Sequence, residues 1–219
     1  MTRQSYSEAY ASAHGRFSLI PAGYVFLLAG AGASFGAAAG VGADAGASTG
    51  AAAGVGVNAD AGASVGAGVV SAPGRVLLQR RAGTGYYDGW WGASAAGHVD
   101  AGESVVQGTI REAAEEIGVR IDAADLVPLT TMHRRGPSAA SVEQRVDFFF
   151  ACRSWTGEPR LLEPKADALR WFDLDALPDR VVHHERLVLD ALRTDALAPI
   201  TAYGFDGEPA QERRQADRP

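Results

Sequence analysis

The spacing of apolar and polar residues predicts four strands and two helices. Runs typical of strands, either alternating or continuously apolar, occupy residues 23–28, 74–80, 146–151 and 169–172. Helical spacing occurs over residues 104–117 and again over 184–197, where Leu187, Leu189 and Leu192 fall near one face. Strands and helices that alternate irregularly indicate an α+β fold with a mixed sheet.

The first predicted helix carries signals at both ends. Ser104 and Gln107 have the spacing of a capping box, in which each side chain binds the backbone N–H of the other residue. Gly118 stands where a left-handed residue would end the helix. Gly108 weakens the helix by roughly 1 kcal/mol relative to alanine. The predicted helix therefore runs from residue 104 to residue 117.

Between the first two strands, residues 29–73 form a low-complexity segment. About two-thirds of its residues are Ala or Gly, and residues 41–48 recur in nearly the same form as residues 57–64. So few large side chains cannot offset the ~1–2 kcal/mol per residue of backbone entropy that ordering costs. We therefore expect a disordered insertion at a hairpin tip, which is cheap because loop-closure entropy grows only logarithmically with length. The alternative is a self-associating element, since uncharged Ala/Gly/Val tracts can pair as strands.

The predicted domain is thus interrupted in sequence. It comprises residues 16–28 and 74–203, with a flexible N-terminus over residues 1–15 and a polar, disordered tail over residues 204–219. Residues 17–43 carry no charge and could span a bilayer or form a signal peptide. Their apolarity is diluted by Ala and Gly in the second half of this range, so we expect no membrane association.

Composition narrows the classes of function. The net charge of −6 argues against a protein that binds a nucleic-acid backbone, because that task needs a basic surface. Cys152 is the only cysteine, so the chain can form no internal disulfide, and a cytoplasmic location is the simplest expectation. An anionic small-molecule substrate would require a bound cation. The sequence is also compatible with a homodimer.

Three glutamates lie close together on the first predicted helix. Glu112, Glu115 and Glu116 stand at i, i+3 and i+4, so they project from about one-third of the helix circumference. Like charges at this spacing repel each other by a few tenths of a kcal/mol per pair. A solvated surface is the ordinary explanation for such a cluster. A divalent cation would remove the repulsion, because Mg²⁺ and Mn²⁺ prefer carboxylate oxygens.

The residues around these glutamates form a longer pattern. It runs Gly, five residues, Glu, seven residues, Arg-Glu, an apolar residue, any residue, Glu-Glu, any residue, Gly and an apolar residue. Its fixed positions are Gly97, Glu103, Arg111, Glu112, Glu115, Glu116 and Gly118. So many fixed positions within one short segment make a specific signal. The chain therefore resembles the Nudix hydrolase family, in particular its MutT-like members.

This resemblance covers most of residues 16–200, apart from the insertion, and implies both a fold and a metal site. The implied fold is a Nudix-type α/β/α sandwich with a mixed sheet. The implied metal is Mg²⁺ or Mn²⁺, with Glu112, Glu115, Glu116 and the backbone carbonyl of Gly97 or its neighbour as ligands. Such a metal stabilises phosphoryl charge and lowers the pKa of its water.

Catalytic roles follow from the same resemblance. Arg111 and Glu103 are expected to form an orienting pair, because arginine can hold a carboxylate with two hydrogen bonds. A plain surface salt bridge is the alternative. Members of the family place the general base on different glutamates, so Glu112 is the first candidate and Glu163, in a later loop, is the second.

Four residues are candidate substrate contacts: Arg81, Tyr87, Trp91 and His98. His98 follows the first glycine of the pattern and could touch phosphate, or it could pack in the interior. Tyr87 and Trp91 could stack on a base or belong to the core. His183 and His184 lack a metal-ligand partner at suitable spacing, so we assign them no role. Many family members have a proline in the loop before the histidine, whereas residues 93–97 lack one, which leaves the rigidity of this loop open.

The predicted activity is hydrolysis of a nucleoside triphosphate to the monophosphate and pyrophosphate. Its basis is that Glu163-Pro-Lys165, followed by Trp171, resembles a segment beside the base pocket of triphosphate-hydrolysing members. One alternative is cleavage of ADP-ribose or NADH, although the signatures of those branches are absent. Another is a non-catalytic nucleotide-binding module, against which the complete set of glutamates argues. A third is an isomerase of the isopentenyl diphosphate type, which would need a cysteine at the pocket.

Overall fold

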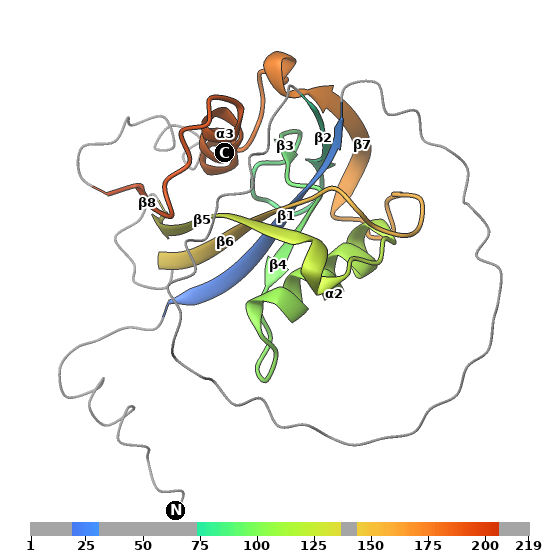
Figure 1. The fold of residues 1–219 in the computed structure, drawn as a ribbon, viewed down its shortest axis with the longest axis horizontal. Helices are drawn as coiled ribbons and strands as arrows, with labels where there is room; N and C mark the ends of the chain where they lie inside the picture. The colour runs from blue at the N-terminus through green and yellow to red at the C-terminus, as the bar shows by residue number, and fades with distance from the viewer. Residues whose placement is uncertain (1–18, 31–73, 137–143, 206–219) are drawn as a thin grey trace, which may run out of the picture.

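The structure, a computed structural model, describes residues 19–30, 74–136 and 144–205 (Figure 1). Its elements follow one another in the order β1 Ile20–Gly30, β2 Gly74–Arg81, β3 Trp91–Gly92, β4 Ala95–His98, α2 Val105–Ile117, η1 Ala123–Asp125, β5 Leu126–Arg135, β6 Gln144–Cys152, β7 Ala166–Asp173, η3 Leu174–Ala176, α3 His183–Arg193 and β8 Ile200–Tyr203.

The strands of the described ranges form one mixed sheet. The order across it is β3-β2-β1-β6-β5-β8, with β4 added beside β1 and β7 beside β2. β1 pairs in parallel with β6, and β5 with β8, whereas the other pairs are antiparallel. The mixed sheet expected from the sequence is confirmed.

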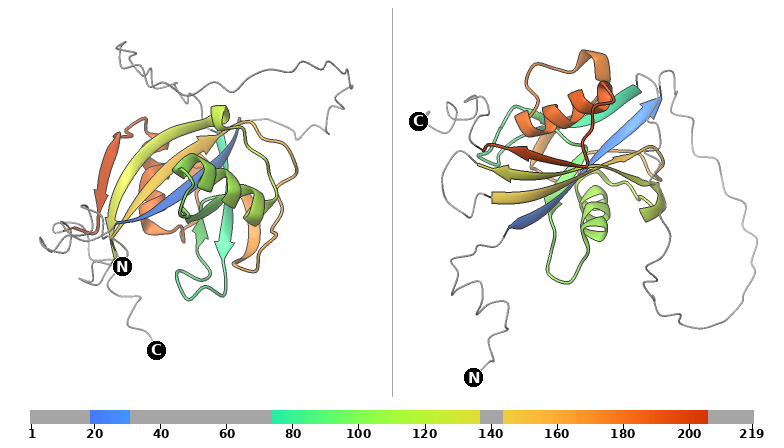
Figure 2. Two further views of the ribbon diagram at one scale, coloured as in Figure 1. Left: turned by 90° about the horizontal axis from the view of Figure 1, so that it is seen from below. Right: turned by 60° about the vertical axis from the view of Figure 1, so that its left-hand side comes forward.

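Side chains of β1 alternate between two apolar cores, one on each face of the sheet. Tyr24 and Phe26 belong to the core that α3 completes with Leu189. Val25 belongs to the core that α2 completes with Ile117. A strand buried on both faces reads as a continuous apolar run, because successive side chains point to opposite faces. Figure 2 shows the two helices on opposite faces, so the expected α/β/α sandwich is confirmed.

The sheet forks along β1. Residues 22–25 of this strand pair with β4, whereas residues 28–30 pair with β2. β4 and β2 therefore pair with different parts of β1 along its length, and the sheet opens between these two strands. At this opening, side chains from elements on opposite faces of the sheet can lie next to one another.

Helix α2 has the predicted boundaries. Ser104 Oγ accepts the N–H of Gln107 at 3.2 Å, and Gln107 Oε1 accepts the N–H of Ser104 at 2.8 Å. Gly118 ends the helix with a left-handed φ of 71°. The helix lies close over β1, because a Cβ on Gly23 would overlap the hydroxyl of Thr109. Both caps therefore fix where the glutamates of α2 project.

The second helix is shorter than predicted. α3 ends at Arg193 and does not reach Leu197. Thr194 Oγ1 donates to the carbonyl oxygen of Asp190 at 2.9 Å, and Asp195 has a left-handed φ of 53°. A left-handed residue just after the last turn stops a helix, and a hydroxyl that binds the backbone competes with it.

The buried face of α3 also differs from the prediction. Leu187 is 49% exposed, and the buried helix residues are His184, Glu185, Val188, Leu189 and Leu192. Residues two apart on a helix do not share a face, so the assignment of Leu187 to the apolar face is wrong. Four strands, β3, β4, β5 and β8, were not predicted, because β5 mixes polar with apolar residues and the other three are no more than four residues long.

β1 and β2 pair as the predicted hairpin strands. Gly30 and Gly74 are directly opposite each other at the end of this pairing. The chain between them, residues 31–73, lies outside the described residues, as do residues 1–18 and 206–219. The expectations for the insertion, the N-terminus and the tail therefore stay predictions. Within the described ranges, every helix is too short or too polar to cross a membrane.

Candidate active site

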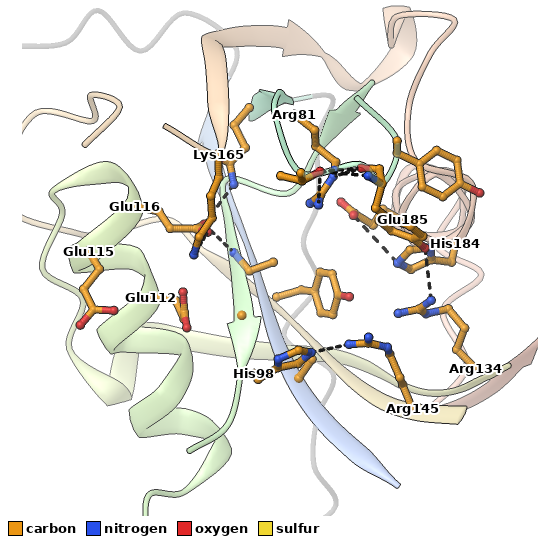
Figure 3. A pocket seen from close by; sticks show the side chains of 18 of the residues that line it. Arg81, His98, Glu112, Glu115, Glu116, Arg134, Arg145, Lys165, His184 and Glu185 are labelled. Atoms are coloured by element: carbon orange, nitrogen blue, oxygen red, sulfur yellow. Dashed lines mark hydrogen bonds and ion pairs between the residues drawn. The ribbon is translucent and has the colours of Figure 1, made fainter. Parts of the chain in front are cut away.

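A cavity of roughly 860 Å³ opens where the sheet forks. Residues of β1, β2, β4, α2, β5, β6 and α3 line it, together with the loop between β2 and β3. Figure 3 shows two groups of side chains across it from each other: the carboxylate wall, Glu112, Glu115 and Glu116, and the inner pocket, Arg134, His184 and Glu185. The carboxylate wall comes from α2 on one face of the sheet, whereas the inner pocket comes from α3 on the other face and from β5 within the sheet.

Arg111 links the acidic residues of α2. Its Nε and Nη2 donate to the two carboxylate oxygens of Glu103 at 3.2 and 2.7 Å. Its Nη1 donates to Glu112 Oε1 at 2.8 Å and to Glu115 Oε2 at 3.0 Å. Glu103 first, and then Glu112, raises the pKa of Arg111 above its usual range. The expected pair of Arg111 and Glu103 is present, and the same guanidinium offsets the repulsion within the carboxylate wall.

Glu116 joins the two branches of the fork. It is 4% exposed, and its Oε2 accepts hydrogen bonds from the Ala96 N–H of β4 and from Gln79 Nε2 of β2, each at 3.0 Å. Lys165 Nζ lies 3.8 Å from its other oxygen. Burial raises the pKa of Glu116, although the bonds from Ala96 and Gln79 act in the opposite direction. This carboxylate therefore holds β4 and β2 at a fixed separation.

Glu112 lies directly against β4. A Cβ on Gly97 would overlap the carboxyl group of Glu112, so any larger residue here would displace that carboxylate. Glu112 is largely buried by this contact. The close approach brings its carboxylate next to the backbone of Gly97, whose carbonyl is the expected backbone ligand.

The oxygen donors of the carboxylate wall fit a hard divalent cation, which prefers carboxylate and carbonyl ligands. No three Asp, Glu, His or Cys side chains within the described ranges are already arranged as a metal site. The contacts explain why: Arg111 Nη1 lies between Glu112 and Glu115 and binds both. A cation would have to displace Nη1 from these oxygens, while the bonds from Arg111 to Glu103 could stay.

His98 and Arg145 form a basic pair at the rim of the cavity. Arg145 Nη1 contacts His98 Nε2, so this ring nitrogen is an acceptor and the ring is neutral. Burial, followed by the charge of Arg145, lowers the pKa of His98. Arg145 was missed in the sequence, because a single arginine on a strand carries no signal of function.

The inner pocket is buried and charged. Arg134 Nε donates to Asp147 Oδ2 at 2.6 Å, and the two side chains are 6% and 0% exposed. Glu185 Oε2 accepts the Ala93 N–H at 2.5 Å. Burial raises the pKa of Glu185 to about 7 and holds the pKa of His184 well below its ordinary value.

Two groups in and behind the inner pocket lack partners. Both ring nitrogens of His184 and the Oδ1 atom of Asp147 are buried without a hydrogen bond among the described residues. The sequence analysis assigned His184 no role, yet the structure places it on the cavity wall. The sequence did contain a signal for buried charged residues. Glu185 stands at helical spacing from the apolar Leu189 and Leu192, and Asp147 interrupts an apolar strand.

The loop between β2 and β3 is held by Arg81. Its Nε donates to the carbonyl oxygen of Tyr86 at 2.8 Å, and its guanidinium carbon lies 5.4 Å from the centre of the Tyr86 ring. Asp88 accepts the N–H of Thr84 at 3.0 Å. Tyr87 has a left-handed φ of 54°, which is costly for a residue with a side chain and needs such support. The loop thereby presents Tyr86 and Tyr87 to the cavity.

Most of the predicted site residues line this one cavity: Arg81, Tyr87, Gly97, His98, Arg111, Glu112, Glu115 and Glu116. Glu103 is connected to it through Arg111, and Glu163 through Lys165, whose Nζ lies 2.8 Å from Glu163 Oε2. Trp91 is placed in the core instead, because its ring packs on Phe172 at 4.7 Å between centroids and is 9% exposed.

The loop at residues 93–97 is rigid without a proline. Ser94 Oγ donates to the Leu77 carbonyl oxygen at 2.6 Å and accepts the Leu27 N–H at 2.8 Å. The bond from Ala93 to Glu185 and the bond from Ala96 to Glu116 fix its two ends. The rigidity that the sequence left open is supplied by buried hydrogen bonds.

Comparisons with known proteins agree with the fold. A family model described as the NUDIX domain matches residues 61–192. The isopentenyl-diphosphate Delta-isomerase of Clavibacter sepedonicus is 30% identical over 52% of this chain and 60% of that protein. The oxidized purine nucleoside triphosphate hydrolase of Danio rerio is 31% identical over 50% of this chain and 65% of that protein. The chain thus spans less than two-thirds of either curated relative.

A solved structure shares the fold. The NUDIX domain of Shewanella oneidensis NrtR, determined in complex with ADP ribose, aligns with a TM-score of 0.52 over 88% of this chain and 99% of that one. The two sequences are 13% identical, so the likeness concerns the architecture alone.

Proposed function

The chain belongs to the NUDIX family, and from this premise we propose that it is a divalent-metal-dependent hydrolase that cleaves a pyrophosphate bond of a nucleotide. The observation that carries the proposal is the shared cavity, in which the carboxylate wall stands beside basic groups suited to phosphate. These basic groups are Arg111, Arg145 and Lys165. An acidic wall alone would repel a polyphosphate, so the proposal requires a cation between them.

The metal would be Mg²⁺ or Mn²⁺, held by Glu112, Glu115 and Glu116 with the carbonyl of Gly97. When bound, it supplies positive charge to the phosphates and lowers the pKa of water. Arg111 exchanges its bonds to Glu112 and Glu115 for phosphate while Glu103 keeps its guanidinium oriented.

In the proposed reaction, water attacks one phosphorus and forms a new P–O bond, while a carboxylate takes a proton from that water. The bridging P–O bond breaks, and its electron pair stays on the bridging oxygen, which leaves with the departing phosphate group. Glu112 is the better candidate for this base, because it lines the cavity, whereas Glu163 does not line it and is paired with Lys165. Arg145 holds a phosphate at the rim, because its guanidinium donates hydrogen bonds, and His98 lines the cavity beside it.

The proposed substrate is a nucleoside triphosphate, which would yield the monophosphate and pyrophosphate. The printed name of the Danio rerio relative supports this substrate class. Cleavage of ADP-ribose or NADH is the alternative within the same chemistry. An isomerase of isopentenyl diphosphate is disfavoured, because Cys152 is fully buried, donates to the Ser154 carbonyl oxygen at 3.0 Å and does not line the cavity.

We extend the proposal to the setting of the enzyme. The free thiol of Cys152 suits a reducing, cytoplasmic compartment. The substrate is a small molecule and not a nucleic acid, given the net charge of −6. Association as a homodimer is left to a measurement of mass in solution.

The test is product analysis over a panel of nucleotides. The full chain is incubated with Mg²⁺ and triphosphates, ADP-ribose, NADH or isopentenyl diphosphate, and the products are separated and identified. We expect monophosphate and pyrophosphate from at least one triphosphate, with kcat/KM above that for ADP-ribose and NADH, and loss of turnover with a chelator. Turnover that persists without a divalent cation would refute the proposal, and the reverse order of kcat/KM would move the chain to the dinucleotide branch.

The matched variants are Glu115→Gln and Glu158→Gln. Glu115 is half-exposed and contributes to the carboxylate wall, whereas Glu158 is an exposed glutamate outside the cavity. Removing one carboxylate from the site should lower kcat by about 100-fold or more. Glu158→Gln should retain wild-type turnover, so a loss confined to Glu115→Gln assigns the effect to the site.

A further inference from the structure

We propose that the inner pocket recognises the base of the substrate and that the base it fits is guanine. The proposal rests on the proposed function, because it names the nucleoside carried by the phosphates that the carboxylate wall would bind. It assigns a specificity role to Arg134 and Glu185, two residues outside the family pattern.

The inner pocket contains polar groups that the protein itself leaves without partners. Both nitrogens of His184 are buried without a hydrogen bond among the described residues, and so is Asp147 Oδ1 behind Arg134. Buried polar groups are nearly always paired, because desolvation without a partner costs free energy. His184 lines the cavity, so a ligand there can reach it. An apolar chain would leave these groups unpaired, which argues against a prenyl substrate.

Glu185 and Glu116 have different charged neighbours. The residues whose charges act on Glu185 are Arg81, Arg134 and Asp147. Those that act on Glu116 are Glu112 and Lys165. The two groups lie across the cavity from each other (Figure 3). The half beside the carboxylate wall suits a metal and phosphates, so the half formed by the inner pocket can take a different part of the same ligand.

Arg134 and Glu185 have complementary hydrogen-bonding roles. A guanidinium only donates, and an ionised carboxylate only accepts. The Watson–Crick edge of guanine presents one acceptor, O6, beside two donors, N1–H and the 2-amino group. Arg134 would donate to O6, and Glu185 would accept the two N–H groups. Adenine and hypoxanthine do not offer two adjacent donors beside a keto oxygen, so they match less completely.

Both side chains are preorganised. Asp147 holds Arg134 through its Nε, and the Ala93 N–H holds Glu185 through Oε2. Within the described ranges no arginine forms an ion pair with Glu185, whose Oε1 lies 3.9 Å from His184 Nε2. Arg134 also donates through Nη1 to the Tyr86 hydroxyl at 3.3 Å, which fixes its guanidinium further. Burial raises the pKa of Glu185 to about 7, so its ionised form lacks stabilisation that two N–H donors would provide.

The test uses nucleosides, which lack phosphate and need no metal. The full chain is titrated with guanosine, inosine and adenosine in the presence of a chelator at pH 8, where Glu185 is ionised, and binding is followed by NMR. We expect guanosine to bind about tenfold or more tightly than either other nucleoside. The proposal would be overturned by equal affinities, by a preference for adenosine or inosine, or by no binding of any of the three. The measurement uses the wild-type protein alone.

The variant Glu185→Gln can keep the bond from Ala93 but replaces one acceptor with a donor. It should lose the guanosine preference, whereas Glu158→Gln should keep it. Retention of the preference in a folded Glu185→Gln protein would also overturn the assignment. If triphosphates are hydrolysed without a guanine preference, this inference fails and the proposed function stands. If guanosine binds but no nucleotide is cleaved, the proposed function fails alone.

Discussion

At the scale of single residues, Arg111 stabilises the acidic side of the cavity without a metal. It binds Glu103 with two hydrogen bonds and places Nη1 between Glu112 and Glu115. Glutamates at i and i+3 would otherwise repel each other. The guanidinium therefore occupies the charge position that a divalent cation takes in the proposed enzyme, so the two compete for the same oxygens.

Replacement of Arg111 tests this competition. Without metal, Arg111→Gln should lower the free energy of unfolding by about 1–3 kcal/mol, because it removes charged hydrogen bonds from a part-buried site. Added Mg²⁺ should then raise the melting temperature of the variant more than that of the wild type. Thermal unfolding with and without Mg²⁺ measures both effects, and an equal shift in the two proteins would contradict the competition.

Glu185 makes stability depend on pH in a direction that can be calculated. Burial raises its pKa from 4.5 to about 7, so the folded protein binds a proton that the unfolded chain has already released. The stabilisation is therefore fully present below pH 4.5 and is lost as the pH rises through 7. The difference in unfolding free energy between wild type and Glu185→Gln should change by roughly 2–4 kcal/mol over this range.

Denaturant unfolding of both proteins at several pH values between 4 and 8, without metal, gives this difference. Other shifted carboxyls such as Glu116 and Asp147 are present in both proteins, so their effects cancel in the comparison. A difference that stays constant with pH would show that Glu185 ionises at its ordinary pKa.

At the scale of elements, the site depends on how closely α2 lies over β4. Gly97 permits this approach, since a Cβ there would overlap the carboxyl group of Glu112. Glu116 then binds both β4 and β2, so one turn of α2 is fixed to both branches of the fork. The geometry of the carboxylate wall is therefore a property of the helix–strand contact.

Gly97→Ala should damage the site more than the fold. Overpacking costs about 1–3 kcal/mol, and it must push Glu112 away from β4, so kcat should fall by an order of magnitude or more. Ser104→Ala is the control, because it weakens the N-terminus of the same helix by about 1 kcal/mol without touching the cavity. Steady-state kinetics and thermal melts separate the two, and comparable kcat losses in both variants would contradict the role of the contact.

The elements with strong local signals could be predicted. The capping box of Ser104, the left-handed Gly118 and the apolar run of β6 carry their structure in adjacent residues. The carboxylate wall followed from its spacing on one helix. The inner pocket was not predicted as a unit, because Arg134, Asp147 and Glu185 lie on β5, β6 and α3, which come together only in the folded chain. The sequence left two roles open for Trp91, stacking on a base and packing in the core, because its contact with Phe172 is long-range.

At the scale of the whole molecule, the hairpin of β1 and β2 connects residues far apart in sequence. Gly30 and Gly74 are opposite each other, so the strand pairing needs no more than a short connection. Two-residue Asn-Gly loops join such antiparallel strands. The functional residues described here lie on both sides of residues 31–73, and none lies within them.

Replacement of residues 31–73 by Asn-Gly should therefore leave kcat/KM within about twofold of the value for the full chain. The melting temperature should not fall, because closing a shorter loop costs less entropy. Hydrolysis assays and thermal melts on the shortened chain check this. Insolubility or loss of activity would mean that these residues are structural or belong to the site.

The central claim is that one cavity binds phosphates at the carboxylate wall and a base in the inner pocket. A crystal structure of Glu115→Gln with Mg²⁺ and the most efficiently cleaved nucleotide tests it most directly, because the variant should bind substrate without turning it over. We expect the phosphates beside Glu112 and Glu116, with the base between Arg134 and Glu185. Phosphates bound away from α2, or a base that leaves the inner pocket empty, would contradict the account.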